Sequence, residues 1–228
     1  MNEYEHVEHG FGPICDAQSE ILILGSMPSP KSRAAGFYYM HPRNRFWQVL
    51  DALYSTVESN TVGSNTVGSN TVGSNTVGSN TVGSNTVGSN TNDIRTDAIK
   101  ARESDGPRLP EASIAEKTAF LLAHRIALWD VLESCDIRGA SDASIRNPVP
   151  NDIAGLIRHS RIHAVYATGR RAADLYRRYS EASLRDAEIT VPLIALPSTS
   201  PANAAMSLPQ LIEAYRCITL TEPTSGKP

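Results

Sequence analysis

The sequence predicts a three-layer α/β/α domain built around a central, mainly parallel sheet of four strands. Short apolar runs alternate with amphipathic segments along the chain, which is the pattern of strands joined by crossover helices. Removing a 35-residue repeat from the 228 residues leaves 193, a size that suits one domain. We therefore expect a single domain, 1–228, that the repeat interrupts.

Four apolar runs are expected to form the sheet. The first, 21–24, is Ile-Leu-Ile-Leu and stops at Gly25, as a strand buried on both faces does. The other three cover 126–129, 162–167 and 191–196. In open parallel sheets, ligands bind at the carboxyl ends of the strands. We therefore look for a site in the segments that follow residues 24, 167 and 196.

Five helices are expected to cover this sheet, from helical spacing of apolar residues and from helix start signals. Asn151 and Asp152 open one of them, and either side chain can cap its first turn. Pro209 fits the first turn of the last helix. The expected helices cover 44–54, Ile114–Ala123, a segment from 151 onward, Arg170–Tyr179 and 207–217.

The repeat consists of seven copies of T-V-[E/G]-S-N from residue 56 to residue 90. A five-residue unit with one Val cannot bury enough apolar surface to offset the entropy of ordering the chain. We interpret 56–90 as a flexible low-complexity insertion, and the polar stretch after it extends the expected loop to about 111. Loop closure entropy grows only slowly with length, so a surface insertion of this size costs little.

Composition and charge exclude several classes of protein. Hydrophobic residues make up 40% and charged residues 20%, which excludes a disordered or fibrous chain. No apolar run approaches a membrane span, and the polar N-terminus has no secretion signal, so we expect a cytoplasmic, nucleoid-associated protein. Three distant cysteines form no disulfide framework. A net charge of −3 means that any nucleic-acid binding must rest on a local basic face.

The segment after the first strand combines a turn-forming glycine with aromatic and amide side chains. Gly25 allows the backbone to turn and expose N–H groups, and Tyr39 offers a planar stacking surface. Asn44 has both a donor and an acceptor, with which it can read a base edge or hold a water. The structural alternative is a set of core aromatics followed by an asparagine that caps a helix.

Two further segments follow strands. The first, 196–203, is Leu-Pro-Ser-Thr-Ser-Pro-Ala-Asn, whose hydroxyl and N–H groups can bind phosphates. An ordinary strand-to-helix turn is the alternative. The second contains Arg170 and Arg171 at the start of a basic helix, which is either a phosphate-facing surface or a solvated face. The six histidines lack metal-site spacing, so no metal is expected, and His41 alone lies in a candidate site segment.

Two motifs resemble those of the uracil-DNA glycosylase superfamily: G-S-M-P-S with Y-Y-M-H-P-R-N-R-F-W, and L-P-S-T-S-P-A-N-A. The strings I-A-L-W-D-V-L-E-S-C, S-I-R-N-P-V-P-N-D and A-T-G-R-R-A-A agree with the same family. The likeness runs from about residue 11 to 215 and is greatest to the hypoxanthine branch, the DNA-deoxyinosine glycosylases. It implies a uracil-DNA glycosylase-like fold and a role in base-excision repair.

The resemblance also implies residue roles. Asn44 matches the main catalytic residue of the hypoxanthine branch, and Tyr39 matches the aromatic that stacks on the extruded base. Met27 stands where the mismatch-specific uracil glycosylases, which share the H-P-x-N-R-F-W string, have a water-holding Asn. The other base-binding residues are expected to be Gly25, Ser26, Met27 and His41. The DNA backbone is expected to contact Ser198, Thr199, Ser200, Asn203 and Arg170.

The implied reaction is hydrolysis of the N-glycosidic bond of an extruded deaminated base, expected to be hypoxanthine. The sugar becomes cationic and the leaving base becomes negative, so Asn44 can serve by bonding the base or by holding the water. No lysine lies in the motifs, which predicts a monofunctional enzyme without a cofactor. The expected partner is double- or single-stranded DNA containing a deaminated base, bound by a monomer.

Three alternatives to a hypoxanthine enzyme stay open on the sequence. The first is a uracil or mismatch-specific DNA glycosylase, because uracil also presents a carbonyl next to an N–H. The second is a nucleic-acid-binding protein of this fold without chemistry. The third is an N-glycosidase of free nucleosides, which would need neither the hydroxyl-rich loop nor the basic helix.

Overall fold

The computed structural model describes residues 3–62 and 108–219. Four strands form one parallel sheet in the order β3-β2-β6-β7. They are β2 (Ile21–Gly25), β3 (Ile126–Asp130), β6 (Ala164–Thr168) and β7 (Leu193–Leu196). These are the four strands expected from the apolar runs, so the predicted fold class is confirmed.

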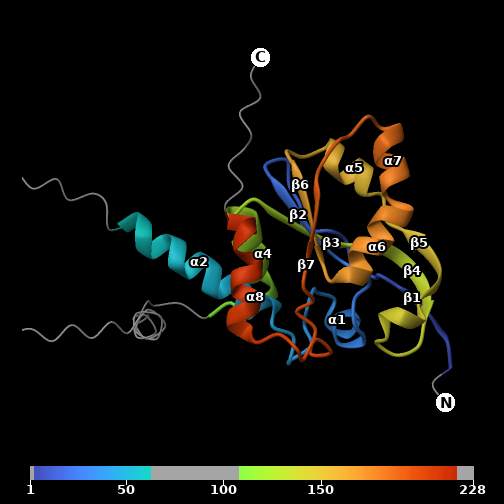
Figure 1. Cartoon of the computed structure of the whole chain (residues 1–228), viewed down its shortest axis with the longest axis horizontal. Coiled ribbons are helices and arrows are strands. Elements are labelled where there is room, and N and C mark those ends of the chain that lie inside the picture. The colour runs from blue at the N-terminus through green and yellow to red at the C-terminus, as the bar shows by residue number, and fades with distance from the viewer. Residues whose placement is uncertain (1–2, 63–107, 220–228) are drawn as a thin grey trace, which may run out of the picture.

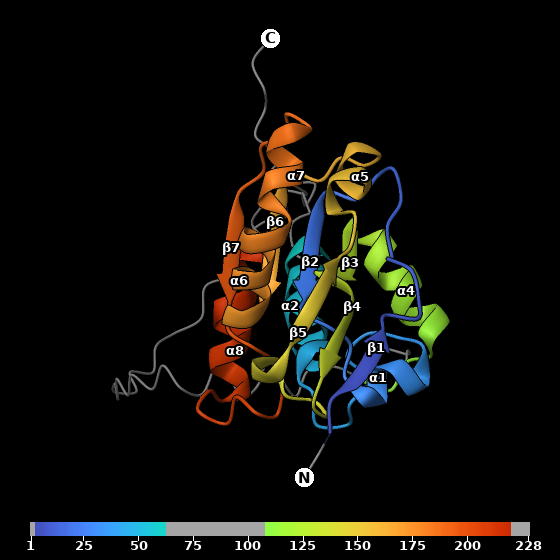
Figure 2. The same ribbon diagram turned by 90° about the vertical axis from the view of Figure 1, so that its right-hand side faces the viewer.

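Helices cover both faces of this sheet, which makes three layers (Figures 1 and 2). Strand β2 shows why, because its successive side chains point to opposite faces. Ile21 and Ile23 pack in one hydrophobic cluster, and Leu22 and Leu24 pack in the other. One face carries α2 (Phe46–Val62), α4 (Ile114–Ala123) and α8 (Leu208–Tyr215). The other carries α5 (Ile153–Arg158), α6 (Arg170–Tyr179) and α7 (Glu181–Asp186).

The helix start signals are confirmed at two positions. Asp152 is the N-cap of α5, and its Oδ1 accepts a hydrogen bond from the Gly155 amide at 2.8 Å. Pro209 lies in the first turn of α8, where its missing N–H leaves no hydrogen bond unmade. Ser207 and Gln210 complete a capping box at the same end.

A second sheet of three antiparallel strands was not expected. It has the order β1-β4-β5, with β1 (Glu5–Glu8), β4 (Leu132–Ile137) and β5 (Arg146–Pro150). Its outer strands carry weak signals, since β1 buries only Val7 and β5 contains two prolines. Strand β4 begins two residues after β3, so the chain leaves the parallel sheet and turns at once. The second sheet brings the N-terminal segment beside the carboxyl end of β3.

The loop expected over 56–111 is shorter at both ends. Helix α2 continues to Val62, and on the far side Leu109 is buried in the core with 8% of its surface exposed. The Leu109 amide donates to the Asp51 carboxylate of α2 at 3.2 Å, which fixes the return of the chain. The remaining repeat units lie in 63–107, outside the described residues. None of the helices in the described ranges is sufficiently long and apolar to cross a bilayer.

Candidate active site

A cavity of about 450 Å³ lies at the carboxyl ends of the parallel strands. Strands β2, β3 and β6 each end in it, and the loop after β7 closes one side. Short additional walls come from α1 (Pro30–Ala35) and from the 3-10 helix η1 (Asp142–Ser144). This is the location that the strand-end rule predicts for a ligand site in such a sheet.

Nine of the eleven predicted site residues line this cavity. The structure therefore brings together two motifs that lie more than 150 residues apart in the sequence. The predicted residues in the cavity wall are Gly25, Ser26, Met27, Tyr39, His41, Asn44, Ser198, Thr199 and Ser200. Arg170 and Asn203 do not reach it.

Tyr39 is held rigidly at the base of the cavity. Its ring stacks on Phe46, with centroids 3.9 Å apart and planes at 20°, so only its other face can receive a ligand. Its backbone has a φ of 56°, which is uncommon for a bulky residue. The hydroxyl lies 2.8 Å from Thr168 Oγ1, which itself donates to the Leu24 carbonyl. The hydroxyl of Tyr39 is therefore the donor of this pair.

The ionisation of Tyr39 is strongly suppressed. Burial raises the pKa of its phenol well above the usual value, and the nearby Asp130 carboxylate raises it further. The side chain is thus neutral, and its hydroxyl proton is donated to Thr168. The ring provides a fixed aromatic surface. Tyr39 is consequently suited to stacking rather than to acid–base chemistry.

Asn44 presents only one half of its amide to the cavity. Its Oδ1 accepts a hydrogen bond from the Phe46 amide at 2.9 Å, at the first turn of α2. Its own backbone N–H donates to the His41 carbonyl at 2.8 Å. Within residues 3–62 and 108–219 the amide nitrogen Nδ2 has no hydrogen-bond partner. The capping role and a functional role are therefore compatible, because the oxygen caps and the nitrogen remains a donor.

His41 is also oriented by its own loop. Its Nδ1 lies 3.2 Å from the Arg43 amide, which can only donate. Nδ1 is therefore the acceptor, and the proton of the neutral ring lies on Nε2. Because His41 lines the cavity, it offers a second donor to a bound ligand.

Arg45, which the sequence did not single out, fastens the two predicted motifs to each other. Its guanidinium donates to the carbonyls of Met206 and Asn203, the latter at 2.8 Å, and to the Ser200 carbonyl at 3.3 Å. Its backbone amide donates to the Thr199 carbonyl at 3.1 Å. Five donors in a rigid fork make arginine well suited to such a clamp.

The loop after β7 is shaped by further internal contacts. Asn203 Nδ2 donates to the Ser198 carbonyl at 2.8 Å, so this side chain stabilises the turn. Gly169 has a φ of 108°, and a Cβ there would lie 3.1 Å from Ser198, so glycine lets β6 and the loop approach closely. Arg170 points away from the cavity, is 96% exposed, and pairs with Asp174 at 3.8 Å.

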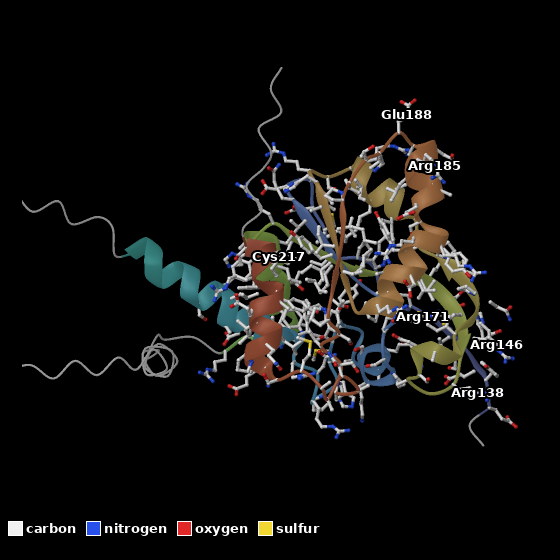
Figure 3. The ribbon with its side chains drawn as sticks, viewed as in Figure 1. Arg138, Arg146, Arg171, Arg185, Glu188 and Cys217 are labelled. Atoms are coloured by element: carbon white, nitrogen blue, oxygen red, sulfur yellow. The ribbon has the colours of Figure 1, made fainter. Side chains whose placement is uncertain are left out.

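Asp142 contributes a carboxylate to the cavity that the sequence did not single out. Ser26 Oγ donates to its Oδ2 at 2.6 Å, which joins residues 116 positions apart. Burial raises the pKa of Asp142, while the Ser26 hydrogen bond lowers it and the Asp130 charge raises it further. The charge of Arg171, at the start of α6 in Figure 3, lowers it again.

Asp130 contributes a second carboxylate, at the last residue of β3. It is 4% exposed, and its Oδ2 lies 2.9 Å from Nε2 of His9, which is equally buried. A Cβ on Gly25 would lie 2.1 Å from the other oxygen, Oδ1, and 3.3 Å from the Tyr39 hydroxyl. Gly25 is therefore required so that this carboxylate can lie across the end of β2.

Asp130 was within reach of sequence reasoning, and His9 was not. Asp130 directly follows the apolar run 126–129, I-A-L-W, so the rule that points to the segments after residues 24, 167 and 196 extends to it as well. His9 lies in a polar N-terminal segment, and only the unexpected pairing of β1 with β4 carries it inward. Among the described residues, no group of three or more His, Cys, Asp or Glu side chains could hold a metal ion.

Comparisons with known proteins agree with this geometry. A family model described as "Uracil DNA glycosylase superfamily" matches residues 11–217. A protein of Methanosarcina acetivorans named "Hypoxanthine DNA glycosylase" is 25% identical over 202 residues, covering 88% of this chain and 91% of the relative. A protein of Methanosarcina barkeri with the same name is 46% identical over 46 residues, only 20% of this chain and 29% of that relative.

A solved structure shows the same fold. It is a solution NMR structure of a Methanosarcina acetivorans protein assigned to the uracil DNA glycosylases, with a TM-score of 0.56 and 24% identity. The match covers 92% of this chain and 97% of that one. The insertion therefore leaves the arrangement of the flanking elements recognisable.

Proposed function

Because the chain belongs to the uracil DNA glycosylase superfamily, we propose that it removes hypoxanthine from DNA as a monofunctional hydrolase. The enzyme would extrude deoxyinosine from the duplex, hydrolyse its N-glycosidic bond and leave an abasic site. Both curated relatives are named for this activity, and one of them aligns with nearly the whole chain. Hypoxanthine is therefore the substrate that the relatives favour over uracil.

The observation that carries the proposal is the meeting of Tyr39, Asn44 and the 198–200 loop in one cavity. A base that leaves the stack loses a few kcal/mol, which stacking and hydrogen bonds to its edge must repay. Tyr39 supplies the stacking surface, since Phe46 holds its ring from behind. The hydroxyl and amide groups of the loop are donors of the kind that bind a DNA backbone.

The Asn44 amide has one atom bound within the protein and one available, and this narrows its expected role. Its oxygen is bound to the start of α2, so the nitrogen is what it offers to a substrate. A leaving purine accumulates negative charge, and a positioned N–H donor stabilises that charge in the transition state. Asn44 is thus better placed to bond the leaving base than to accept a hydrogen bond from water.

No lysine lines the cavity among the described residues, which supports simple hydrolysis without a covalent imine. The proposal therefore predicts release of the free base and an intact, alkali-labile abasic strand. A lyase would instead cut the strand without added alkali.

The test is a panel of duplex oligonucleotides that each contain one deoxyinosine, deoxyuridine or deoxyxanthosine. Single-turnover rates of base release are measured with wild type and with Asn44→Asp. This variant keeps an oxygen to cap α2 and removes the N–H₂ donor. We expect the fastest release from the inosine duplex, and a loss of about 100-fold or more in the variant.

A control variant on helix α2 separates chemistry from folding. Gln48 is exposed on α2, and Gln48→Glu adds a comparable charge without touching the cavity. It should act as wild type does. Faster release of uracil than of hypoxanthine by the wild-type protein would refute the proposed specificity.

A further inference from the structure

The buried pair His9–Asp130 lies against the cavity wall and has no place in the roles proposed so far. Both side chains are 4–6% exposed, and Asp130 nevertheless forms part of the cavity lining. Oδ2 is occupied by His9, whereas Oδ1 has no hydrogen-bond partner among the described residues. A buried carboxylate without a structural need is costly, so its retention beside a cavity points to a use.

The hydrogen atoms of the pair can be assigned from its neighbours. His9 Nδ1 lies 2.6 Å from the Phe11 carbonyl, which can only accept, so Nδ1 carries a hydrogen. Nε2 and Oδ2 are 2.9 Å apart, and this contact requires a second hydrogen between them. The imidazole is therefore fixed in position at both nitrogens, and it holds one carboxylate oxygen while leaving the other to the cavity.

Among the described residues that line the cavity, only Asp130 and Asp142 carry a carboxylate. The oxygen of Asn44 caps α2, and the hydroxyl of Ser26 donates to Asp142. Met27 has only a thioether at its position. Water that attacks the sugar must give up a proton, so an acceptor has to come from elsewhere in the wall.

We infer that Asp130 is a catalytic carboxylate of this site and that His9 is its positioning residue. The inference rests on the proposed function and adds a group to it. As the N-glycosidic bond breaks, its electron pair passes to the base, and the water oxygen forms a bond to C1′ of the deoxyribose. The proton of that water passes to Oδ1 of Asp130, and the departing base takes a proton from solvent.

The same carboxylate also stabilises the sugar electrostatically. The deoxyribose gains positive charge as the base departs, and a fixed negative group in a water-poor wall interacts strongly with that charge. Tyr38, Tyr39 and Asp142 are the other titratable groups that interact with Asp130. The two tyrosines are neutral because burial raises their pKa.

Asp142 is the competing carboxylate, and its geometry is less suitable. It lies on η1 at the rim, is partly exposed, and already accepts from Ser26. Its carboxylate is held by one serine hydroxyl beside the charge of Arg171, whereas Asp130 is fixed by His9 and by the end of β3. Asp142 therefore serves as the internal comparison in the test.

The test compares Asp130→Asn with Asp142→Asn in single-turnover release of hypoxanthine from duplex DNA. Asparagine keeps the shape of the side chain, and its amide can still bond His9, so only the charge is lost. Asp130→Asn should slow base release by about 100-fold or more at unchanged duplex affinity, and Asp142→Asn by much less. Formate added to Asp130→Ala should restore part of the rate, which a structural role would not allow.

The control uses the exposed pair His6–Asp136 of the same N-terminal segment. Asp136→Asn should retain the wild-type rate. For the positioning role, His9→Gln returns a donor to Asp130 and should lower kcat less than His9→Leu does, with KM unchanged in both.

Each failure is distinct. Wild-type release combined with a full rate in Asp130→Asn, or with a larger loss in Asp142→Asn, overturns the inference and leaves the proposed function intact. Absence of base release by the wild-type protein from every duplex overturns the proposed function, and the inference falls with it.

Discussion

Two histidine–aspartate pairs start from the same N-terminal segment and differ sharply in burial. His6 and Asp136 are 2.8 Å apart, and His9 and Asp130 are 2.9 Å apart. The first pair is 60% and 28% exposed, and the second is 4% and 6% exposed. Contact distance is therefore no guide to what the pairs do, because water screens the first and is excluded from the second.

The path of the chain explains the difference. His6 faces Asp136 directly across the β1–β4 ladder, at the edge of the antiparallel sheet. After β1 ends, the His9 amide donates to the Glu133 carbonyl at 2.7 Å and the chain turns inward. The His9 ring then packs 4.5 Å from the Phe11 ring, and the latter meets Tyr38 edge-on at 4.8 Å. The histidine of the solvated pair and the histidine of the pair enclosed by aromatic rings are thus only three positions apart in the sequence.

The largest predicted effect is a loss of folding stability when the histidine of the buried pair is removed. His9→Leu leaves the buried Asp130 without its partner, and we expect the free energy of unfolding to fall by about 3 kcal/mol or more. His6→Leu should cause no measurable change, because its partner is already hydrated. Urea denaturation of both variants, followed by tryptophan fluorescence, measures the two values. Equal losses in the two variants would contradict the comparison.

A smaller effect is expected when the buried pair is disturbed from its other side. In Gly25→Ala the new methyl group would lie 2.1 Å from Asp130 Oδ1, so the carboxylate must move. We expect an unfolding free energy lower by about 1–3 kcal/mol and a marked drop in base release. Gly12→Ala is the matched control, because a Cβ there meets nothing within 4 Å. A fully active Gly25→Ala protein would show that the position of Oδ1 is unimportant.

The smallest effect concerns acid stability and belongs to the exposed pair. Hydrogen bonds from Asn147 and then His6 hold the pKa of Asp136 below its usual 3.8. The ionised carboxylate therefore contributes stability above that value and loses it as the pH falls through the lower, folded-state pKa. The Tm difference between wild type and Asp136→Asn should shrink below pH 3.8. A constant difference across that range would exclude this linkage.

Much of the fold could be predicted because its central strands are continuous apolar runs. The runs in β2, β3 and β6 are almost wholly buried, so composition alone marks them, whereas β7 lies at the sheet edge and is only partly buried. The antiparallel sheet could not be predicted because its outer strands bury few apolar residues. Strand β5, R-N-P-V-P, lies at an edge and buries little, so its sequence carries almost no periodic signal.

The site divides in the same way. Residues of the two motifs could be placed at strand ends, and the structure brings Tyr39, Asn44 and Ser198 to one cavity. Contacts that depend on tertiary pairing could not be placed. Ser26 meets Asp142 across 116 positions, and His9 meets Asp130 across 121, with no local pattern to announce either contact. Such partners become visible only when the register of the second sheet is known.

Helix α2 has a consequence for how this chain tolerates change in length. Arg45, directly before its first turn, holds the loop after β7, and the 17 residues of the helix extend about 25 Å from there. In Figure 1 this helix projects away from the body of the molecule. The described part of the repeat, residues 56–62, forms the far end of this helix, so a unit gained or lost there changes the chain length well away from the residues that line the cavity.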